Sequence, residues 1–394
     1  MFNKLTNPYS YSYTQHNKVR FVRAGKPYFD VLKQLINTAH QTIHLQYYIY
    51  DDDETGMEVS KALIQAAQRG VQVFILVDGY ASKGLSKSFI KELEFSGIHF
   101  KFFNPIFKSQ FFYFGRRLHH KVLVVDALYS LVGGINISDK YNDTIKGNAW
   151  LDFAVSIEGE ISKELCFVCE KFWKTPKIHS KNNCAPIVST ERYTSLPNCL
   201  IRMRRNDWVW AENKISATYF EMFRTCTSHI TILSSYFLPG RTFRKHLAKA
   251  AKRGIKVKVI VAGLSDVMLA KYAERFMYRW LLKNNIEIYE YQKNILHGKV
   301  AVCDERIVTI GSYNINNLSA YVSLELNVDI NNIQFSREIE STIDGIITNE
   351  CIPITEEKFN QITPFLKYAL YWTSYQILRV VFNLCTFYFK QKRH

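Results

Sequence analysis

The sequence predicts an α/β protein made of two similar domains that form a pseudo-dimer. Three observations support this prediction: a short motif that occurs twice, a longer repeat around each copy, and an alternation of strand and helix patterns in each half. The length of 394 residues is enough for about two domains of ordinary size.

The short motif occurs once in each half of the chain. One copy extends from His119 to Asn136 and the other from His297 to Asn314, and both fit H-x-K-x4-D-x6-G-[GS]-x-N. A single H-x-K carries little information. Two copies with all five elements in register would rarely arise by chance, so they indicate a duplicated site.

The histidine and lysine of each copy suit a phosphate group. Side chains alternate between the faces of a strand, so His119 and Lys121 point the same way, as do His297 and Lys299. An imidazole can attack phosphorus or donate a proton, and an ammonium neutralises negative oxygen. A core strand with a hydrogen-bonded histidine would explain one copy alone equally well, but the second copy favours the phosphate site.

The rest of each motif predicts a buried strand followed by a turn. The apolar residues after each lysine are typical of a buried strand. Asp126 and Asp304 are expected to begin the turn and to stabilise it rather than to contact substrate. The glycines that follow let the backbone and the amides of Asn136 and Asn314 approach a ligand closely.

The repeat extends beyond the motif. Upstream of it, each half shows a strand, an amphipathic helix that stops at a glycine, and a second strand, in the ranges 43–48, 56–68 and 71–77 and again in 230–237, 243–252 and 255–261. Each half is expected to run strand, helix, strand, helix and motif strand, which favours a largely parallel sheet covered by helices.

Composition along the chain suggests where the domains end. We expect a first domain over residues 1–175, a linker over 176–200, a second domain over 201–363 and a tail over 364–394. The linker has three prolines among polar residues and lacks periodicity. The N-terminal residues lack the apolar core of a signal peptide, and no run of about 20 apolar residues predicts a membrane span.

The eight cysteines show no disulfide framework, and free thiols would suit a reducing cytosolic environment. Cys166 and Cys169 form the only C-x-x-C pair, and no second pair or histidine cluster completes a zinc site. Both share a helical face with Leu165 and Phe172. Core packing is therefore expected here rather than metal or redox chemistry.

The charge predicts an anionic partner. A formal net charge of +16 and a pI of about 9.3 suit nucleic acid or an acidic membrane. Aromatic residues stand beside arginines in the stretch 107–117, just before His119. They could hold acyl chains or stack bases at the mouth of a phosphate site, or they could pack as a buried loop.

The tail over 364–394 helps to choose between these partners. It has no acidic residue, is mostly apolar from Phe365 to Phe389, and ends in Lys390, Lys392 and Arg393. Its polar residues recur every three or four positions, which is typical of an amphipathic helix in the interface of an anionic membrane. A helix packed on the protein or on a dimer partner is the alternative, and Arg379 in mid-segment argues against a spanning helix.

The paired motifs resemble the HKD motifs of the phospholipase D superfamily. Flanking phrases over most of residues 40–330 are similar to bacterial cardiolipin synthases, for example Tyr47–Tyr50 and Ser235–Pro239. The sequence shows no paired N-terminal transmembrane helices and therefore resembles the shorter, peripheral members. The resemblance implies two phospholipase D-like domains with one active site between them.

The resemblance also implies residue roles. The catalytic set would be the six motif residues His119, Lys121, Asp126, His297, Lys299 and Asp304. One histidine, assigned as His119, attacks the phosphodiester and forms a phosphatidyl-histidine, while His297 protonates the departing alcohol. No metal and no cofactor takes part.

Further residues would support these two histidines. Together with the two lysines, Asn136 and Asn314 would bind the non-bridging phosphate oxygens. Asp152 and Glu325 lie downstream of the two motifs and would orient the histidine rings, although either could be an ordinary carboxylate at a strand end.

The expected activity is phosphatidyl transfer that makes cardiolipin from phosphatidylglycerol, by a peripheral enzyme at the cytoplasmic face of the cell membrane. Three alternatives stay open: a phospholipase D-type hydrolase, a phosphodiesterase or nuclease that binds nucleic acid, and an inactive binding module. The apolar tail argues against the nuclease, and the two intact motifs argue against the inactive module. The oligomeric state is left open.

Overall fold

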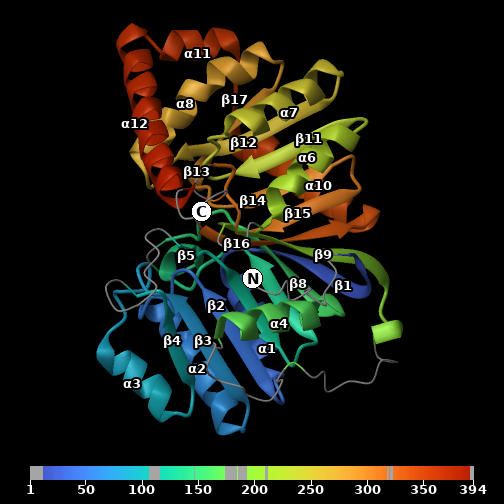
Figure 1. The fold of residues 1–394 in the computed structure, drawn as a ribbon, viewed down its shortest axis with the longest axis vertical. Helices are drawn as coiled ribbons and strands as arrows, with labels where there is room; N and C mark the ends of the chain where they lie inside the picture. The colour runs from blue at the N-terminus through green and yellow to red at the C-terminus, as the bar shows by residue number, and fades with distance from the viewer. Residues whose placement is uncertain are drawn as a thin grey trace.

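The computed structural model describes residues 12–105, 116–145, 147–173, 184, 193–208, 212–316, 319 and 323–390, with side chains described as far as residue 382. The chain forms two lobes arranged along the long axis of the molecule (Figure 1). Most of the aromatic stretch 107–117 lies outside the described residues, as do most of the linker 176–200 and the last cations of the tail, Lys392 and Arg393.

The first lobe is built on a seven-stranded mixed sheet. Its strands lie in the order β4 (His99–Phe103), β3 (Gln72–Asp78), β2 (Thr42–Tyr47), β6 (Lys121–Val125), β7 (Tyr129–Gly133), β8 (Phe153–Gly159) and β1 (Thr14–Arg23). Strands β4, β3 and β2 are parallel, and each later neighbour is antiparallel.

The second lobe repeats this order and adds one strand at the edge. Its strands are β17 (Cys351–Ile354), β13 (Glu287–Ile295), β12 (Lys256–Leu264), β11 (His229–Ser234), β14 (Lys299–Cys303), β15 (Ile307–Gly311), β16 (Ser323–Asn331) and β9 (Asn198–Asp207). A short strand β10 (Glu212–Asn213) pairs with β9, and β9 also meets β1 of the first lobe.

The expectation of a largely parallel sheet is therefore wrong in part. The strand–helix–strand portion of each half is parallel, but the motif strands β6 and β14 run antiparallel to both of their neighbours. A tight turn joins each motif strand to the strand that follows it and makes that pair antiparallel, because only antiparallel strands can be joined in this way.

The motif aspartates hold these turns. Asp126 has a φ of 52° and the next residue also 52°, while Asp304 and its successor have 52° and 50°, which is the geometry of a type I′ turn. The Asp126 carboxylate accepts hydrogen bonds of 2.8 Å from the backbone N–H groups of three residues at the start of β2, His40, Gln41 and Thr42. Asp304 accepts the matching set from residues 227–229. Although burial raises the pKa of Asp304, these donors lower it to about 2.

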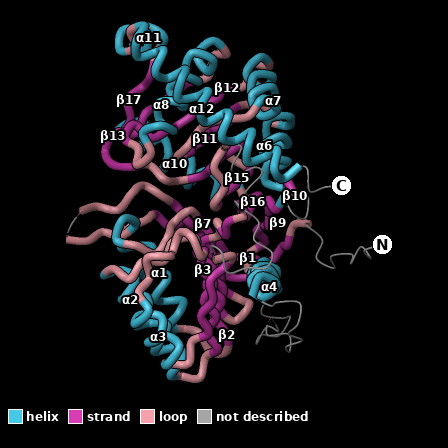
Figure 2. Tube along the Cα trace, turned by 60° about the vertical axis from the view of Figure 1, so that its left-hand side comes forward, coloured by secondary structure: helices cyan, strands magenta, loops and turns pink. Residues whose placement is uncertain are grey.

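Helices cover the outer face of each sheet. The first lobe carries α1 (Lys26–Asn37), α2 (Glu54–Gln68) and α3 (Lys87–Phe95), and the second carries α6 (Lys214–Thr225), α7 (Arg241–Lys252), α8 (Met268–Lys283) and α11 (Glu356–Ile362). The inner faces carry α4 (Ile161–Trp173) and α10 (Ile333–Glu350). Figure 2 shows α1, α2 and α3 together on one side of the first-lobe strands and α4 on the other.

One apolar core joins the lobes. Alternation along the motif strands sends Val122 and Val124 into the same cluster as Val300 and Val302 of the other lobe. The intervening residues, Leu123 among them, face the separate outer core beneath the helices. The two motif strands therefore lie back to back at the lobe junction, which places both copies of the motif in one region.

The cysteine expectation is wrong for one pair. Cys166 of α4 forms a disulfide with Cys184, and their Cα atoms lie 5.8 Å apart. Cys169 of the same helix is buried as a free thiol in the inter-lobe core, as the core-packing interpretation of this helix predicted. The pairing depends on where the chain after α4 returns, and cysteine spacing carries no signal for that.

The tail forms the helix α12 (Phe365–Lys390), which packs along α8. Tyr371 and Phe382 are buried in this contact, and the rings of Tyr371 and Tyr272 stack 5.7 Å apart. The helix therefore has a protein-bound face, which was the alternative to a purely interfacial helix. A second apolar stripe on it faces outward: Leu366, Leu370, Ile377, Val380 and Val381. Within the described residues, no helix is long and apolar enough to cross a membrane.

Candidate active site

The two motif histidines lie at the lobe junction, and each is fixed by the backbone of the opposite lobe. The N–H of His119 donates to the carbonyl of Leu324 at 3.0 Å, and the N–H of His297 donates to the carbonyl of Leu151 at 2.8 Å. The first contact extends the parallel pairing of β5 (Arg117–Leu118) with β16, and the second extends a bridge between Leu151 and Leu296. Each motif thus receives the same backbone contact from the other lobe, as expected for two lobes related by a pseudo-twofold axis.

Asp152 and Glu325, the carboxylates predicted from the sequence to orient the histidines, each contact the histidine of the opposite lobe. Nδ1 of His119 lies 2.8 Å from Oε2 of Glu325, and Nδ1 of His297 lies 2.6 Å from Oδ2 of Asp152. A carboxylate on Nδ1 holds that nitrogen as the donor and leaves Nε2 with a lone pair. Each carboxylate is therefore placed to orient the histidine of the other motif.

The two histidine–carboxylate pairs differ in one supporting contact. In the second motif, the hydroxyl of Ser312 donates to Glu325 Oε2 at 2.5 Å. The matching position in the first motif is Gly134, where an added Cβ would collide with the Asp152 carboxylate. The motif therefore has serine at position 312, where the side chain contacts Glu325, and glycine at position 134, where a side chain would overlap Asp152. The sequence showed this variable position but not its cause.

The two lysines are buried beside the histidines. Nζ of Lys121 donates to the His119 carbonyl at 2.9 Å, and Nζ of Lys299 donates to the His297 carbonyl and lies 3.1 Å from His297 Nδ1. Burial lowers the pKa of Lys121 well below its usual value and that of Lys299 to about 8. Each ammonium has three donors, so donors remain for a phosphate.

The two motif asparagines are held in place by the segments after β2 and β11. Asn136 accepts the N–H of Ile49 at 3.1 Å and donates to the Tyr141 hydroxyl at 2.9 Å. Asn314 accepts the hydroxyl of Ser235 at 2.6 Å. These hydrogen bonds fix both amides, and the Tyr141 hydroxyl links that of Asn136 to His297.

Aromatic rings enclose the two imidazoles, and sequence reasoning gave them no role. Tyr48 meets His119 edge-on with ring centroids 4.8 Å apart, and the same ring lies 5.0 Å from Lys121 Nζ. Tyr141, from the short 3-10 helix η1 (Asp139–Tyr141), places its hydroxyl 3.4 Å from Nε2 of His297. No pattern in the sequence predicts that Tyr141 contacts the second motif.

Burial decides the charge of the histidines. It lowers the pKa of His119, aided by the Lys121 charge and opposed by Glu325. It lowers the pKa of His297 well below the ordinary value, and it raises the pKa of Asp152 to about 7. Burial thus favours the neutral form of both rings and the protonated form of Asp152.

Asp126 and Asp304 stand apart from this centre. Each lies at the far end of a five-residue strand from its lysine, which is roughly 17 Å at 3.3 Å per residue. Their carboxylates bond to backbone before β2 and β11. Among the described residues, the two groups with close metal-type ligands, His44–Cys166–Cys184 and Cys226–Cys303–Asp304, contain neither motif histidine.

Comparisons with known proteins identify the family of both lobes. The family model described as "Cardiolipin synthase, PLD-like domain" matches residues 32–165 and 219–347, one match per lobe. "Cardiolipin synthase B" of Escherichia coli (strain K12) is 30% identical over 363 residues, covering 88% of this chain and 84% of the relative. "Cardiolipin synthase" of Halalkalibacterium halodurans is 31% identical over 328 residues, covering 82% of this chain and 63% of the relative.

Solved structures share the fold. The phosphatidylserine synthase of Haemophilus influenzae Rd KW20 superposes with a TM-score of 0.71 at 14% identity, over 93% of this chain and 94% of that one. A polyphosphate kinase of Porphyromonas gingivalis superposes with a TM-score of 0.52 at 14% identity, over 83% of this chain and 50% of that one. With two family matches, a duplicated motif and a curated relative at this level of identity, the chain belongs to the cardiolipin synthase family of phospholipase D-like enzymes.

Proposed function

We propose that the protein transfers a phosphatidyl group from one phosphatidylglycerol molecule to another and so makes cardiolipin and glycerol. The observation that supports this most is the pair of imidazoles at the lobe junction, each bound through Nδ1 to a carboxylate of the opposite lobe. Two such rings suit a double displacement, in which one acts as nucleophile and the other as acid and base.

In the first step, Nε2 of His119 bonds to the donor phosphorus and the bond from phosphorus to the headgroup oxygen breaks. The lowered pKa of His119 leaves its ring neutral and nucleophilic. The departing alkoxide takes a proton from the His297–Asp152 pair. Burial raises the pKa of Asp152 to about 7, so this pair can hold the proton near neutral pH.

In the second step, a glycerol hydroxyl of the acceptor phosphatidylglycerol attacks the phosphorus. Its proton passes to His297, and the bond from phosphorus to His119 breaks. Lys121, Lys299, Asn136 and Asn314 stabilise the negative charge that develops on the non-bridging oxygens in both steps. Water in place of the acceptor hydroxyl would give phosphatidic acid, the product of the hydrolase alternative.

We further propose that the enzyme docks on an anionic membrane through the outer helical layer of the second lobe. The exposed stripe of α12 supplies apolar side chains that are 43–81% exposed: Leu366, Leu370, Ile377, Val380 and Val381. Such a stripe opposite a packed face is typical of an interaction surface rather than of a core helix.

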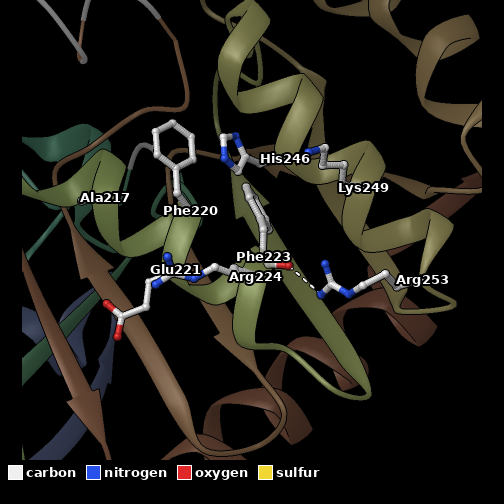
Figure 3. Close-up of a pocket in the computed structure, with 8 residues that line it drawn as sticks. All are labelled: Ala217, Phe220, Glu221, Phe223, Arg224, His246, Lys249 and Arg253. Carbon is white, nitrogen blue, oxygen red and sulfur yellow. Dashed lines mark hydrogen bonds between the residues drawn. The ribbon is translucent and has the colours of Figure 1, made fainter.

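Helix α7, whose Arg244 lies over the Trp280 ring of α8, adds positive charge to the outer helices of this lobe. It carries five cations and no acid: Arg241, Arg244, Lys245, Lys249 and Lys252. The matching first-lobe helix α2 has two glutamates and one lysine. A basic pocket opens between α6 and α7, where the rings of Phe220 and His246 stack beside Lys249 and Arg253 (Figure 3). Cations near a membrane surface contribute about 1 kcal/mol each toward anionic lipid.

The transfer reaction is tested with labelled phosphatidylglycerol in vesicles. We expect cardiolipin and glycerol as products, and a phosphatidyl-histidine that can be trapped by a denaturing quench at neutral to mildly alkaline pH, because the P–N bond is labile in acid. His119→Ala should give no trapped intermediate, and His297→Ala should trap it slowly and fail to turn it over. Phosphatidic acid as the sole lipid product would contradict the transfer. A trapped intermediate in His119→Ala but not in His297→Ala would reverse the roles.

The pH dependence tests the role of Lys299. Its pKa is lowered to about 8, so the charged form that binds phosphate is present below this pH and is lost above it. We expect kcat/KM to fall above pH 8 in the native enzyme. Lys299→Arg should lower activity but move the alkaline fall upward, because arginine stays charged. Lys256→Arg, on the exposed surface, is the matched control. A fall that stays near pH 8 in Lys299→Arg would contradict the assignment.

The membrane surface is tested with a triple variant of the α12 stripe, Leu370→Gln, Ile377→Gln and Val381→Gln. Loss of apolar burial should weaken binding to phosphatidylglycerol vesicles by at least about tenfold in a sedimentation assay. The control removes three exposed apolar side chains elsewhere, Met57, Phe95 and Ile333, in the same way. Equal binding by both triple variants would contradict the proposal and would point to residues 107–114. Deleting α12 is less informative, because it would uncover the packed face of α8.

A further inference from the structure

Asp266 is a carboxylate at the edge of a cationic phosphate site. It is exposed and stands two residues after the end of β12. The last residue of β12, Leu264, pairs with Ile295, which precedes His297 by two positions. The loop that carries Asp266 therefore starts at the same edge of the sheet as the second motif.

Asp266 is held by a tyrosine that belongs to the site. The hydroxyl of Tyr236 donates to Asp266 Oδ1 at 2.6 Å. Tyr236 directly follows Ser235, whose hydroxyl is bonded to Asn314 of the second motif. Within the described part of the chain, Tyr236 is the one hydrogen-bond partner of Asp266, so Oδ2 is open to a ligand.

The charge of Asp266 acts on the motif residues. It favours the protonated forms of His297 and Lys299 and raises the pKa of Tyr141 further above its usual value. A carboxylate in this place repels the anionic phosphate that the site has to bind. If Asp266 contributes to substrate binding, it therefore contacts a part of the substrate other than the phosphate, one that donates hydrogen bonds.

The carboxylate occurs on one side of the pseudo-twofold axis. The strand registers show which residues of the two lobes correspond. In the first lobe, Tyr47 pairs with Lys121 on one side and with Val77 of β3 on the other. In the second lobe, Ser234 pairs with Lys299, and continuing the register of β11 and β12 by one residue places Val261 beside it. By this count the first-lobe counterpart of Asp266 is Ser82, which is fully buried and donates to the Tyr48 carbonyl. The two flanks of the phosphate site thus differ, and the carboxylate lies on the flank of His297.

We propose that Asp266, oriented by Tyr236, binds the alcohol headgroup that leaves and enters at His297, by accepting a hydrogen bond from a second hydroxyl of a neutral polyol such as glycerol. The inference rests on the proposed transfer reaction and adds the acceptor site to it. A neutral polyol fits better than an ammonium alcohol, because the ammonium of Lys299, on which the Asp266 charge acts, would repel a cation. Asp266 only accepts a hydrogen bond, so it forms no covalent bond and the bonds made and broken are those of the transfer reaction.

The test supplies [14C]glycerol to the full-length enzyme on phosphatidylglycerol vesicles. Labelled phosphatidylglycerol reports transfer to the added polyol, and phosphatidic acid reports hydrolysis of the same intermediate. Asp266→Asn should raise the KM for glycerol about tenfold, the loss expected for one hydrogen bond to a charged group, and lower the ratio of transfer to hydrolysis by a similar factor. Tyr236→Phe should shift both quantities in the same direction by less. Glu338→Gln removes an exposed carboxylate elsewhere and should leave both unchanged.

Each other outcome overturns the inference. A rate loss in Asp266→Asn with an unchanged KM and ratio would show a general effect on folding or on His297. A wild-type preference for ethanolamine over glycerol that disappears in Asp266→Asn would show an ammonium site instead. A wild-type enzyme that forms no labelled phospholipid refutes the transfer reaction, and the inference with it. Normal transfer with an unaltered ratio in Asp266→Asn refutes the inference alone.

Discussion

The exchange of hydrogen bonds across the lobe junction is the constraint on which the site depends. His119 takes its backbone partner and its carboxylate from β16 of the second lobe, and His297 takes both from the segment before β8 of the first. Neither lobe can orient its own histidine. The apolar core that joins the motif strands is therefore also what sets the positions of the reacting groups, because a shift between the sheets would separate each ring from its carboxylate.

Burial at this junction has opposing electrostatic consequences. It favours the neutral form of both imidazoles and raises the Asp152 pKa. In the proposed reaction, this suits one ring to attack and the other pair to hold a proton. It also weakens the charge of Lys121 and Lys299, the groups that have to meet phosphate. An anionic substrate resolves this conflict, because its charge favours the ammonium forms once it is bound. Bound phosphate therefore raises the pKa of both ammonium groups and opposes the effect of burial.

Much of this arrangement follows from the sequence, since spacing alone placed His119 with Lys121, His297 with Lys299, and the two motifs in matching lobes. Asp152 and Glu325 were also nominated, but their exchange between motifs was not, because it depends on the register of strands far apart in the chain. The antiparallel motif strands were missed because Asp126 and Asp304 adopt positive φ in turns that lack the usual glycine. A tail helix packed on the protein stayed an open alternative in the sequence, because buried and exposed aromatic residues look alike in a helical pattern.

The central claim, that each carboxylate serves the histidine of the other lobe, is tested most directly by the pre-steady-state burst of 4-nitrophenol from a nitrophenyl phosphodiester. This leaving group needs no protonation, so the burst reports attack by His119 alone. The account predicts that Glu325→Gln slows the burst by about 10- to 100-fold, the usual cost of losing such an orienting partner. Asp152→Asn should keep the burst and slow only the later turnover, in which His297 takes a proton. A burst that survives in Glu325→Gln and is lost in Asp152→Asn would contradict the account.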